Sequence, residues 1–98
     1  MRLDKWLKVS RLIKRRTVAQ MACEQGRVQV NDRIAKSGHD LKFGDLVHIE
    51  LGIRALTVKV LDIPFKNVPA QSANSLYEII EEIKRAPEVL EWLNDDDF

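Results

Sequence analysis

A chain of 98 residues, 45% hydrophobic and 32% charged, has room for one compact domain, which excludes a catalytic domain beside a separate binding domain. Its single cysteine, Cys23, excludes an internal disulfide or a cysteine-based zinc site and favours a reducing, cytoplasmic compartment. No segment resembles a signal peptide or approaches the roughly 20 apolar residues of a membrane span, so no membrane association is expected.

The formal net charge of +1 conceals an uneven distribution along the chain. Residues 1–66 contain 14 Lys/Arg and 7 Asp/Glu, whereas residues 67–98 contain 2 and 8. This division predicts a basic domain over residues 1–66 and an acidic extension over residues 67–98. Residues 1–16 contain one acidic residue, Asp4, and seven basic residues, which are Arg2, Lys5, Lys8, Arg11, Lys14, Arg15 and Arg16. Such an excess of one sign indicates a polyanionic partner.

Two amphipathic helices are predicted first. Over roughly residues 3–12, apolar side chains recur on one side of a helix and basic side chains on the other. Trp6 falls on the apolar side, so we expect it to pack in the core rather than stack on a base. Asp4 is expected to pair with Lys8 or to orient Arg11. A second helix is predicted from about residue 15 to residue 25, and Gly26 stops it.

The period then changes from 3.6 to 2, which indicates strands. Residues 27–30, 47–51 and 56–60 alternate apolar and polar side chains, and a short return strand opens at Ile34. Asn31-Asp32 supplies the turn of the first hairpin. The pattern predicts an α+β fold in which two helices cover one face of a small, mostly antiparallel sheet.

The acidic end of the chain has helical spacing. Ser75 and Glu78 match a capping box, and Leu76, Ile79, Ile80 and Ile83 follow at intervals of three and four. We therefore expect a C-terminal helix from Ser75 and a short final helix after Pro87. These helices either pack on the sheet or repel the polyanionic partner from their side of the molecule.

The basic cluster carries the functional prediction. Lys8, Arg11, Lys14, Arg15 and Arg16 bridge the two predicted helices, and a rigid helix pair holds cations at the fixed separations that a phosphate backbone requires. A charge run is commonly a solvated helix face, but the density and single sign of this one favour nucleic-acid binding. The side chains of Ser10 and Asn31 supply hydrogen bonds to phosphate or to a ribose hydroxyl.

Several motifs in order resemble the S4 RNA-binding domain over residues 2–51. They are Arg2-Leu3-Asp4-Lys5-Trp6-Leu7, Ser10-Arg11, Lys14-Arg15-Arg16, Gly26-Arg27-Val28-Gln29-Val30-Asn31 and Gly44-Asp45. The resemblance implies the S4 (alpha-L) fold and an RNA-binding face on the helix pair. The expected RNA-binding residues are Arg2, Lys5, Lys8, Ser10, Arg11, Lys14, Arg15, Arg16, Arg27 and Asn31. Asp32 departs from the glycine common at that turn, and Ala35 from a frequent proline.

The opening motif and the continuation into Asn74-Ser75-Leu76-Tyr77 are similar to the bacterial heat-shock S4 protein and to the shorter RqcP family. That resemblance implies a ribosome-associated factor that binds ribosomal RNA of the large subunit and tRNA. In such proteins this binding supports C-terminal alanine tailing of stalled chains together with an RqcH-like quality-control partner. Arg2 and Arg16 are then the first expected contacts, and the protein is expected to be monomeric off the ribosome.

Two alternatives stay open from the sequence. One is a ribosome-assembly or general structured-RNA-binding module, and the other is an interaction protein whose acidic C-terminal helices recruit a partner. An enzyme is not expected, because no catalytic residues, metal ligands or cofactor motif can be assembled from the sequence.

Overall fold

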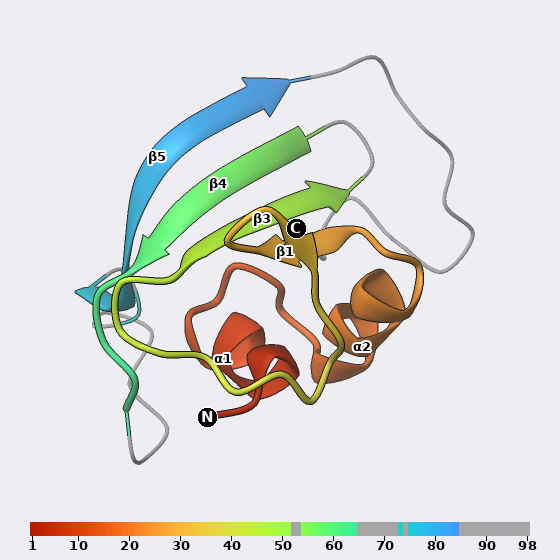
Figure 1. Ribbon diagram of the computed structural model, residues 1–98, viewed down its shortest axis with the longest axis horizontal. Coiled ribbons are helices and arrows are strands. Elements are labelled where there is room, and N and C mark those ends of the chain that lie inside the picture. Colours follow the sequence, from red (N-terminus) through yellow and green to blue (C-terminus); the bar gives the residue numbers. More distant parts are fainter. Residues whose placement is uncertain (52–53, 65–72, 74, 85–98) are drawn as a thin grey trace.

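The described part of the chain folds into two short helices and one five-stranded sheet, with both helices on the same side of the sheet (Figure 1). The computed structural model describes residues 1–51, 54–64, 73 and 75–84. The predicted class, two N-terminal helices over an antiparallel sheet, is confirmed. In chain order the elements are α1 (Leu3–Val9), α2 (Arg16–Glu24), β1 (Val28–Val30), β2 (Arg33–Ile34), β3 (Leu46–Leu51), β4 (Arg54–Val60) and β5 (Tyr77–Lys84).

Each strand is antiparallel to its neighbours, and the order across the sheet is β2-β1-β3-β4-β5. Successive side chains of a strand point to opposite faces, so alternate residues of β3 and β4 turn towards the helices. The buried residues of this face are Val47, Ile49 and Leu51 from β3 and Leu56, Val58 and Val60 from β4. The alternation predicted for these two segments is confirmed.

Trp6 is the largest side chain of the core beneath the sheet. It is fully buried together with Leu3 and Leu7, as the sequence predicted. Its indole Nε1 donates a hydrogen bond of 3.1 Å to the backbone carbonyl of Asp62, which gives the buried N–H the partner that it needs. Trp6 therefore also fixes the chain just after β4 against α1.

The first helix is shorter than predicted and ends at Val9. Arg11 adopts φ +65°, and its backbone N–H donates to the carbonyl of Lys8. This left-handed conformation closes many helices and favours glycine, because other side chains are strained in it. The turn places Leu12 and Ile13 in the core. A continuing helix would have left Leu12 among the basic side chains.

The β1–β2 hairpin has a two-residue turn at Asn31 and Asp32. Their φ angles are +50° and +67°, and Val30 pairs with Arg33 across the turn. Positive φ at both central residues defines a type I′ turn, so Asp32 keeps the geometry that glycine would adopt more easily. The Asn31 side chain braces the turn, since its Oδ1 accepts from the Leu46 N–H at 3.0 Å and its Nδ2 donates to Asp45 at 3.1 Å.

Residues Tyr77–Lys84 form β5, so the prediction of a helix from Ser75 is wrong. β5 lies at one edge of the sheet and pairs with β4, from Tyr77 opposite Val60 to Lys84 opposite Arg54. These residues thus belong to the same sheet as the first part of the chain, not to a separate helical extension. The short helix predicted after Pro87 lies outside the described residues.

β5 contains a bulge opposite β4. Thr57 pairs with Glu81 and Val58 with Ile79, and this register shift leaves Ile80 without a partner strand residue. An extra residue interrupts the alternation of a strand. Ile79 pairs with Val58 and Ile83 with Ala55, so these two isoleucines lie on opposite faces of the sheet. Isoleucine is β-branched and favours strands, and pairing with β4 outweighs the local capping motif.

Candidate RNA-binding site on the helix pair

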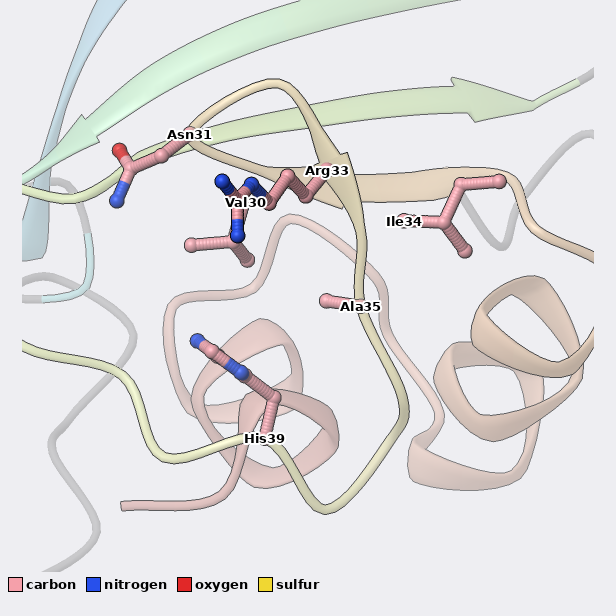
Figure 2. Close-up of a pocket in the computed structure, with 6 residues that line it drawn as sticks. All are labelled: Val30, Asn31, Arg33, Ile34, Ala35 and His39. Atoms are coloured by element: carbon pink, nitrogen blue, oxygen red, sulfur yellow. The ribbon is translucent and has the colours of Figure 1, made fainter.

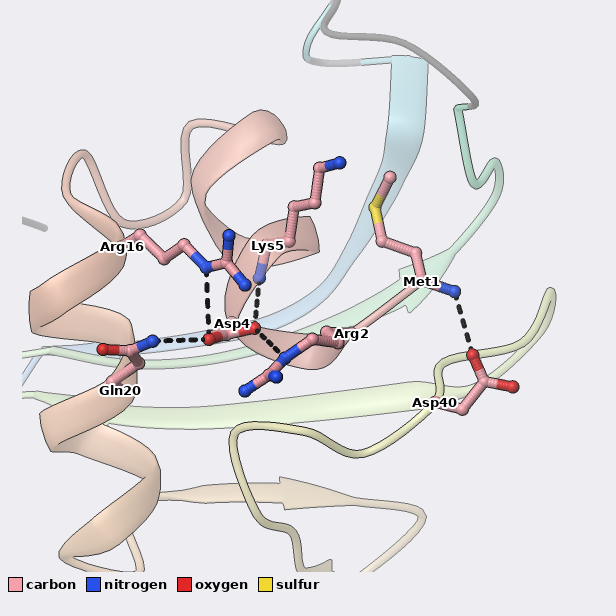
Figure 3. Close-up of polar contacts among 7 residues, drawn as sticks. All are labelled: Met1, Arg2, Asp4, Lys5, Arg16, Gln20 and Asp40. Atoms are coloured by element: carbon pink, nitrogen blue, oxygen red, sulfur yellow. Dashed lines mark hydrogen bonds and ion pairs between the residues drawn. The ribbon is translucent and has the colours of Figure 1, made fainter.

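A buried carboxylate in the first turn of α1 organises the basic residues around it (Figure 3). Oδ1 of Asp4 accepts hydrogen bonds from Arg2 Nε at 3.2 Å and from the Lys5 backbone N–H at 2.8 Å. Oδ2 accepts from Arg16 Nε at 3.2 Å and from Gln20 Nε2 at 2.9 Å. Because Arg16 and Gln20 belong to α2, this one carboxylate joins the two helices.

Opposing effects set the pKa of Asp4. Burial raises the pKa, since it disfavours the charged form, but the hydrogen bonds from Gln20, Arg16 and the Lys5 N–H outweigh burial. The net result is a pKa below the ordinary value, so the carboxylate is ionised at neutral pH. The partners expected from the sequence, Lys8 and Arg11, were wrong: Asp4 pairs with Arg2 and Arg16 instead.

Arg2 and Arg16 keep most of their hydrogen-bonding capacity. Each uses Nε for Asp4, and in the part of the chain that the structure describes neither donates a hydrogen bond through its terminal nitrogens. The Arg2 side chain is 54% exposed and the Arg16 side chain 43% exposed. Two guanidinium groups are therefore oriented by a buried anion, with their outer nitrogens left for a ligand such as phosphate.

These cations border a surface hollow of about 500 Å³. One part of its lining is basic and the other is apolar, and the apolar part includes the segment after β4 that Trp6 holds in place. The lining residues are Met1, Arg2, Lys5, Arg16, Ile63 and Pro64. The structure thus brings together three of the predicted RNA-binding residues at a single concave site.

Three further cations of the predicted cluster are exposed and lack an ion pair among the residues described. Lys8 is in the last turn of α1, and Arg11 and Lys14 are in the connection to α2. Arg15 is also exposed and caps the N-terminus of α2 with extended backbone. These predicted residues lie along the helix pair, and no carboxylate of β5 holds the three unpaired cations.

Ser10, one of the predicted RNA-binding residues, is buried at the end of α1. Its side chain is only 1% exposed, and its hydroxyl donates to the Leu7 carbonyl at 3.1 Å. The hydroxyl closes the end of α1 internally and has almost no surface for a ligand, and its contact with RNA stays a prediction. The sequence pattern could not show this burial, because the chain turns inward directly after Ser10.

Arg27 and Asn31 lie apart from the helix residues, at the two ends of β1. Arg27 is half-buried and donates from Nε to Gln25 at 3.3 Å. Asn31 is exposed, but its amide braces the hairpin turn through Asp45 and Leu46. RNA contact by these two residues stays a prediction.

A second hollow, of about 510 Å³, lies between the β1–β2 hairpin and the loop that follows it (Figure 2). In Figure 2 His39 reaches from that loop towards the hairpin. The basic residues of its lining, Arg33 and His39, were not assigned to the site from the sequence. Met1, Ile63 and Pro64 of the first hollow were also not assigned to the site from the sequence, because isolated apolar residues give no sequence pattern that indicates RNA binding.

Other kinds of chemistry find little support in the described residues. None of their His, Cys, Asp and Glu side chains form a group of three that could hold a metal ion. Burial raises the pKa of the Cys23 thiol to about 12, which keeps it protonated and unreactive. Among the helices described, none is long and apolar enough to cross a membrane.

The fold and the basic helix pair define a class of protein, and comparison with known proteins agrees with it. The S4 domain family matches residues 1–47. In a solved structure of Vibrio cholerae heat shock protein 15, 30% of the aligned residues are identical, and the match covers 81% of this chain and 80% of that one with a TM-score of 0.75. The protein is an S4-domain protein.

Sequence relatives narrow the assignment. An RQC P-site tRNA stabilizing factor of Streptococcus pneumoniae is 50% identical over 84 residues, which are 86% of this chain and 94% of that protein. The protein of the same name from Halalkalibacterium halodurans is 49% identical over 82 residues, 84% of this chain and 92% of its own length. The chain belongs to the family of RQC P-site tRNA stabilizing factors.

Proposed function

We propose that this protein is an RNA-binding factor that associates with the large ribosomal subunit and stabilises P-site tRNA there during ribosome-associated quality control. The name of its relatives supports the tRNA and quality-control part of the proposal. The observation that carries the RNA-binding part is the arrangement of Arg2 and Arg16, whose guanidinium groups are anchored on buried Asp4 and exposed beyond it.

This role is one of binding, without catalysis and without a cofactor. Ribosomal RNA and peptidyl-tRNA both present phosphates, and cations held at fixed positions gain affinity from each phosphate that they neutralise. The protein would act in the cytoplasm as a monomer off the ribosome. On the obstructed subunit it would support C-terminal alanine tailing of the stalled chain with an RqcH-like partner.

Sedimentation with purified large subunits tests the proposal. Wild-type protein is expected to co-sediment with subunits that carry peptidyl-tRNA and much less with empty subunits. An Arg2→Ala/Arg16→Ala double variant should lose most of this association, whereas Lys36→Ala, which removes an exposed cation outside the helix pair, should retain it. Circular dichroism would verify that each variant is folded.

The same experiment separates the proposal from its alternative. Equal binding to empty subunits, to occupied subunits and to free structured RNA would indicate a ribosome-assembly or general RNA-binding module. Failure of wild-type protein to bind occupied subunits would reject the quality-control role.

A further inference from the structure

We propose that the hollow beside α1 binds one unpaired nucleotide of the RNA, with its phosphate on the basic side and its base on the apolar side. The basic side is Arg2, Lys5 and Arg16, and the apolar side is Met1, Ile63 and Pro64. This inference rests on the proposed RNA-binding function and adds a recognition element to it. A charged half and an apolar half within one concavity match the two chemical parts of a nucleotide.

The basic side has the charge that a phosphate requires. The lining contains three cations, and two of them, Arg2 and Arg16, share the single buried carboxylate of Asp4. Two of the three positive charges are therefore left uncompensated by Asp4. The outer nitrogens of Arg2 and Arg16 donate no hydrogen bond within the described part of the chain. One guanidinium group can donate two parallel hydrogen bonds to the oxygens of a phosphate. Asp4 holds both groups in place, so little side-chain freedom is lost when the phosphate binds.

The apolar side is held rigidly by the fold. Trp6 donates to the Asp62 carbonyl, the Ile63 N–H donates to the Asp62 carboxylate at 2.8 Å, and the Asp62 N–H donates to the Leu76 carbonyl at 3.2 Å. Ile63 and the Pro64 ring are half-buried, so each still presents surface. A fixed apolar wall can cover the face of a base and remove it from water.

The arrangement selects against paired RNA. In a duplex both faces of a base are covered by its neighbours, so only edges and the backbone reach a protein. A base that leaves the stack exposes its faces, which can pack on a side chain. The volume of about 500 Å³ lies within the range of roughly 300–1,000 Å³ of pockets that hold small ligands.

Three RNA hairpins of equal length test this inference. One has a single-nucleotide bulge, the second has the same bulge without its base, and the third is fully paired. Wild-type protein is expected to bind the first at least about fivefold more tightly than the second, because only the base can use the apolar wall. The abasic bulge retains the phosphate and the flexible backbone and so isolates the contribution of the base.

Ile63→Thr removes part of the apolar wall while it keeps the β-branched shape. This variant should reduce the preference for the base to below about twofold and leave affinity for the paired hairpin unchanged. Leu61→Thr is the matched control, since Leu61 is 36% exposed and lies two residues away, outside the lining. If Ile63→Thr does not fold, Pro64→Ala reports on the same wall.

The outcomes distinguish this inference from the function on which it rests. Equal binding of wild type to all three hairpins, or an unchanged preference in the folded Ile63→Thr or Pro64→Ala variant, would overturn the nucleotide pocket and leave RNA binding intact. Absence of binding to every hairpin would overturn both, because the pocket requires RNA contact.

Discussion

The basic residues of the helix pair fall into two groups that differ in how they are held. The anchored pair, Arg2 and Arg16, donates to a buried carboxylate, whereas the free cations, Lys8, Arg11 and Lys14, lack an ion pair among the described residues. Hydrogen bonds to Asp4 therefore fix the positions of the guanidinium groups in the anchored pair, whereas the free cations contribute positive charge without a fixed position. The anchored pair should contribute to both folding and recognition, and the free cations chiefly to long-range attraction.

The largest effect is expected from Asp4→Ala. This change removes the acceptor of four donors, so the free energy of unfolding should fall by about 2–3 kcal/mol, and RNA affinity should fall because Arg2 and Arg16 lose their orientation. Urea denaturation measures the stability. Asp40→Ala is the control, since Asp40 is an exposed carboxylate that pairs with the N-terminus. Equal small losses in both variants would contradict an organising role for Asp4.

A pair of single substitutions sharpens the comparison between the groups. Arg16→Ala should weaken RNA binding about tenfold and lower the free energy of unfolding by about 1 kcal/mol, since a charge-assisted hydrogen bond to Asp4 is lost. Lys14→Ala should weaken binding only about two- to threefold and leave stability unchanged. Fluorescence anisotropy with a structured RNA and thermal melts would measure both quantities. Equal losses of RNA affinity and of stability in Arg16→Ala and Lys14→Ala would contradict the difference between the anchored pair and the free cations.

Arg11→Gly should change stability and binding in opposite directions. Glycine adopts the left-handed conformation at φ +65° without strain, so the free energy of unfolding should rise by roughly 0.5–1 kcal/mol. Loss of one exposed cation should at the same time weaken RNA binding slightly. A destabilised variant would show that the Arg11 side chain makes a structural contribution beyond its charge.

The smallest effect expected is in the acid range. Because the pKa of Asp4 is lowered in the folded protein, its contribution to stability is fully present above its unfolded value of about 3.9 and is lost as the pH falls through the folded value. Wild-type protein should lose this contribution below about pH 4, and Asp4→Asn should lack that part of the pH dependence. If the free energy of unfolding had the same pH dependence in wild type and Asp4→Asn, the lowered pKa of Asp4 would be contradicted.

The sequence predicts those features that local periodicity determines. The two helices, the apolar position of Trp6 and the alternation of β3 and β4 follow from spacing alone. β5 was missed because its apolar residues have the spacing of a helix and follow a capping motif, whereas its pairing with β4 is a contact between distant segments of the chain. The end of α1 was misplaced because Arg11 occupies a position where glycine would have been the signal.

The candidate site divides in the same way. Its cations are visible in the sequence as a run of one sign, but their organisation depends on packing between helices. Asp4 meets Arg16 and Gln20 only after α1 and α2 are in contact, at separations of 12 and 16 residues. The apolar wall at Ile63 reaches α1 through Trp6 and Asp62, which are 56 residues apart. Contacts of this kind have no periodic signature.

The salt dependence of RNA affinity tests most directly whether cations on the helix pair bind the phosphate backbone. For about six neutralised phosphates, the logarithm of the affinity should fall against the logarithm of the salt concentration with a slope of roughly −4 to −5. In Arg16→Ala the slope should be smaller in magnitude by about 1. A flat response in wild type, or an unchanged slope in Arg16→Ala, would contradict the account.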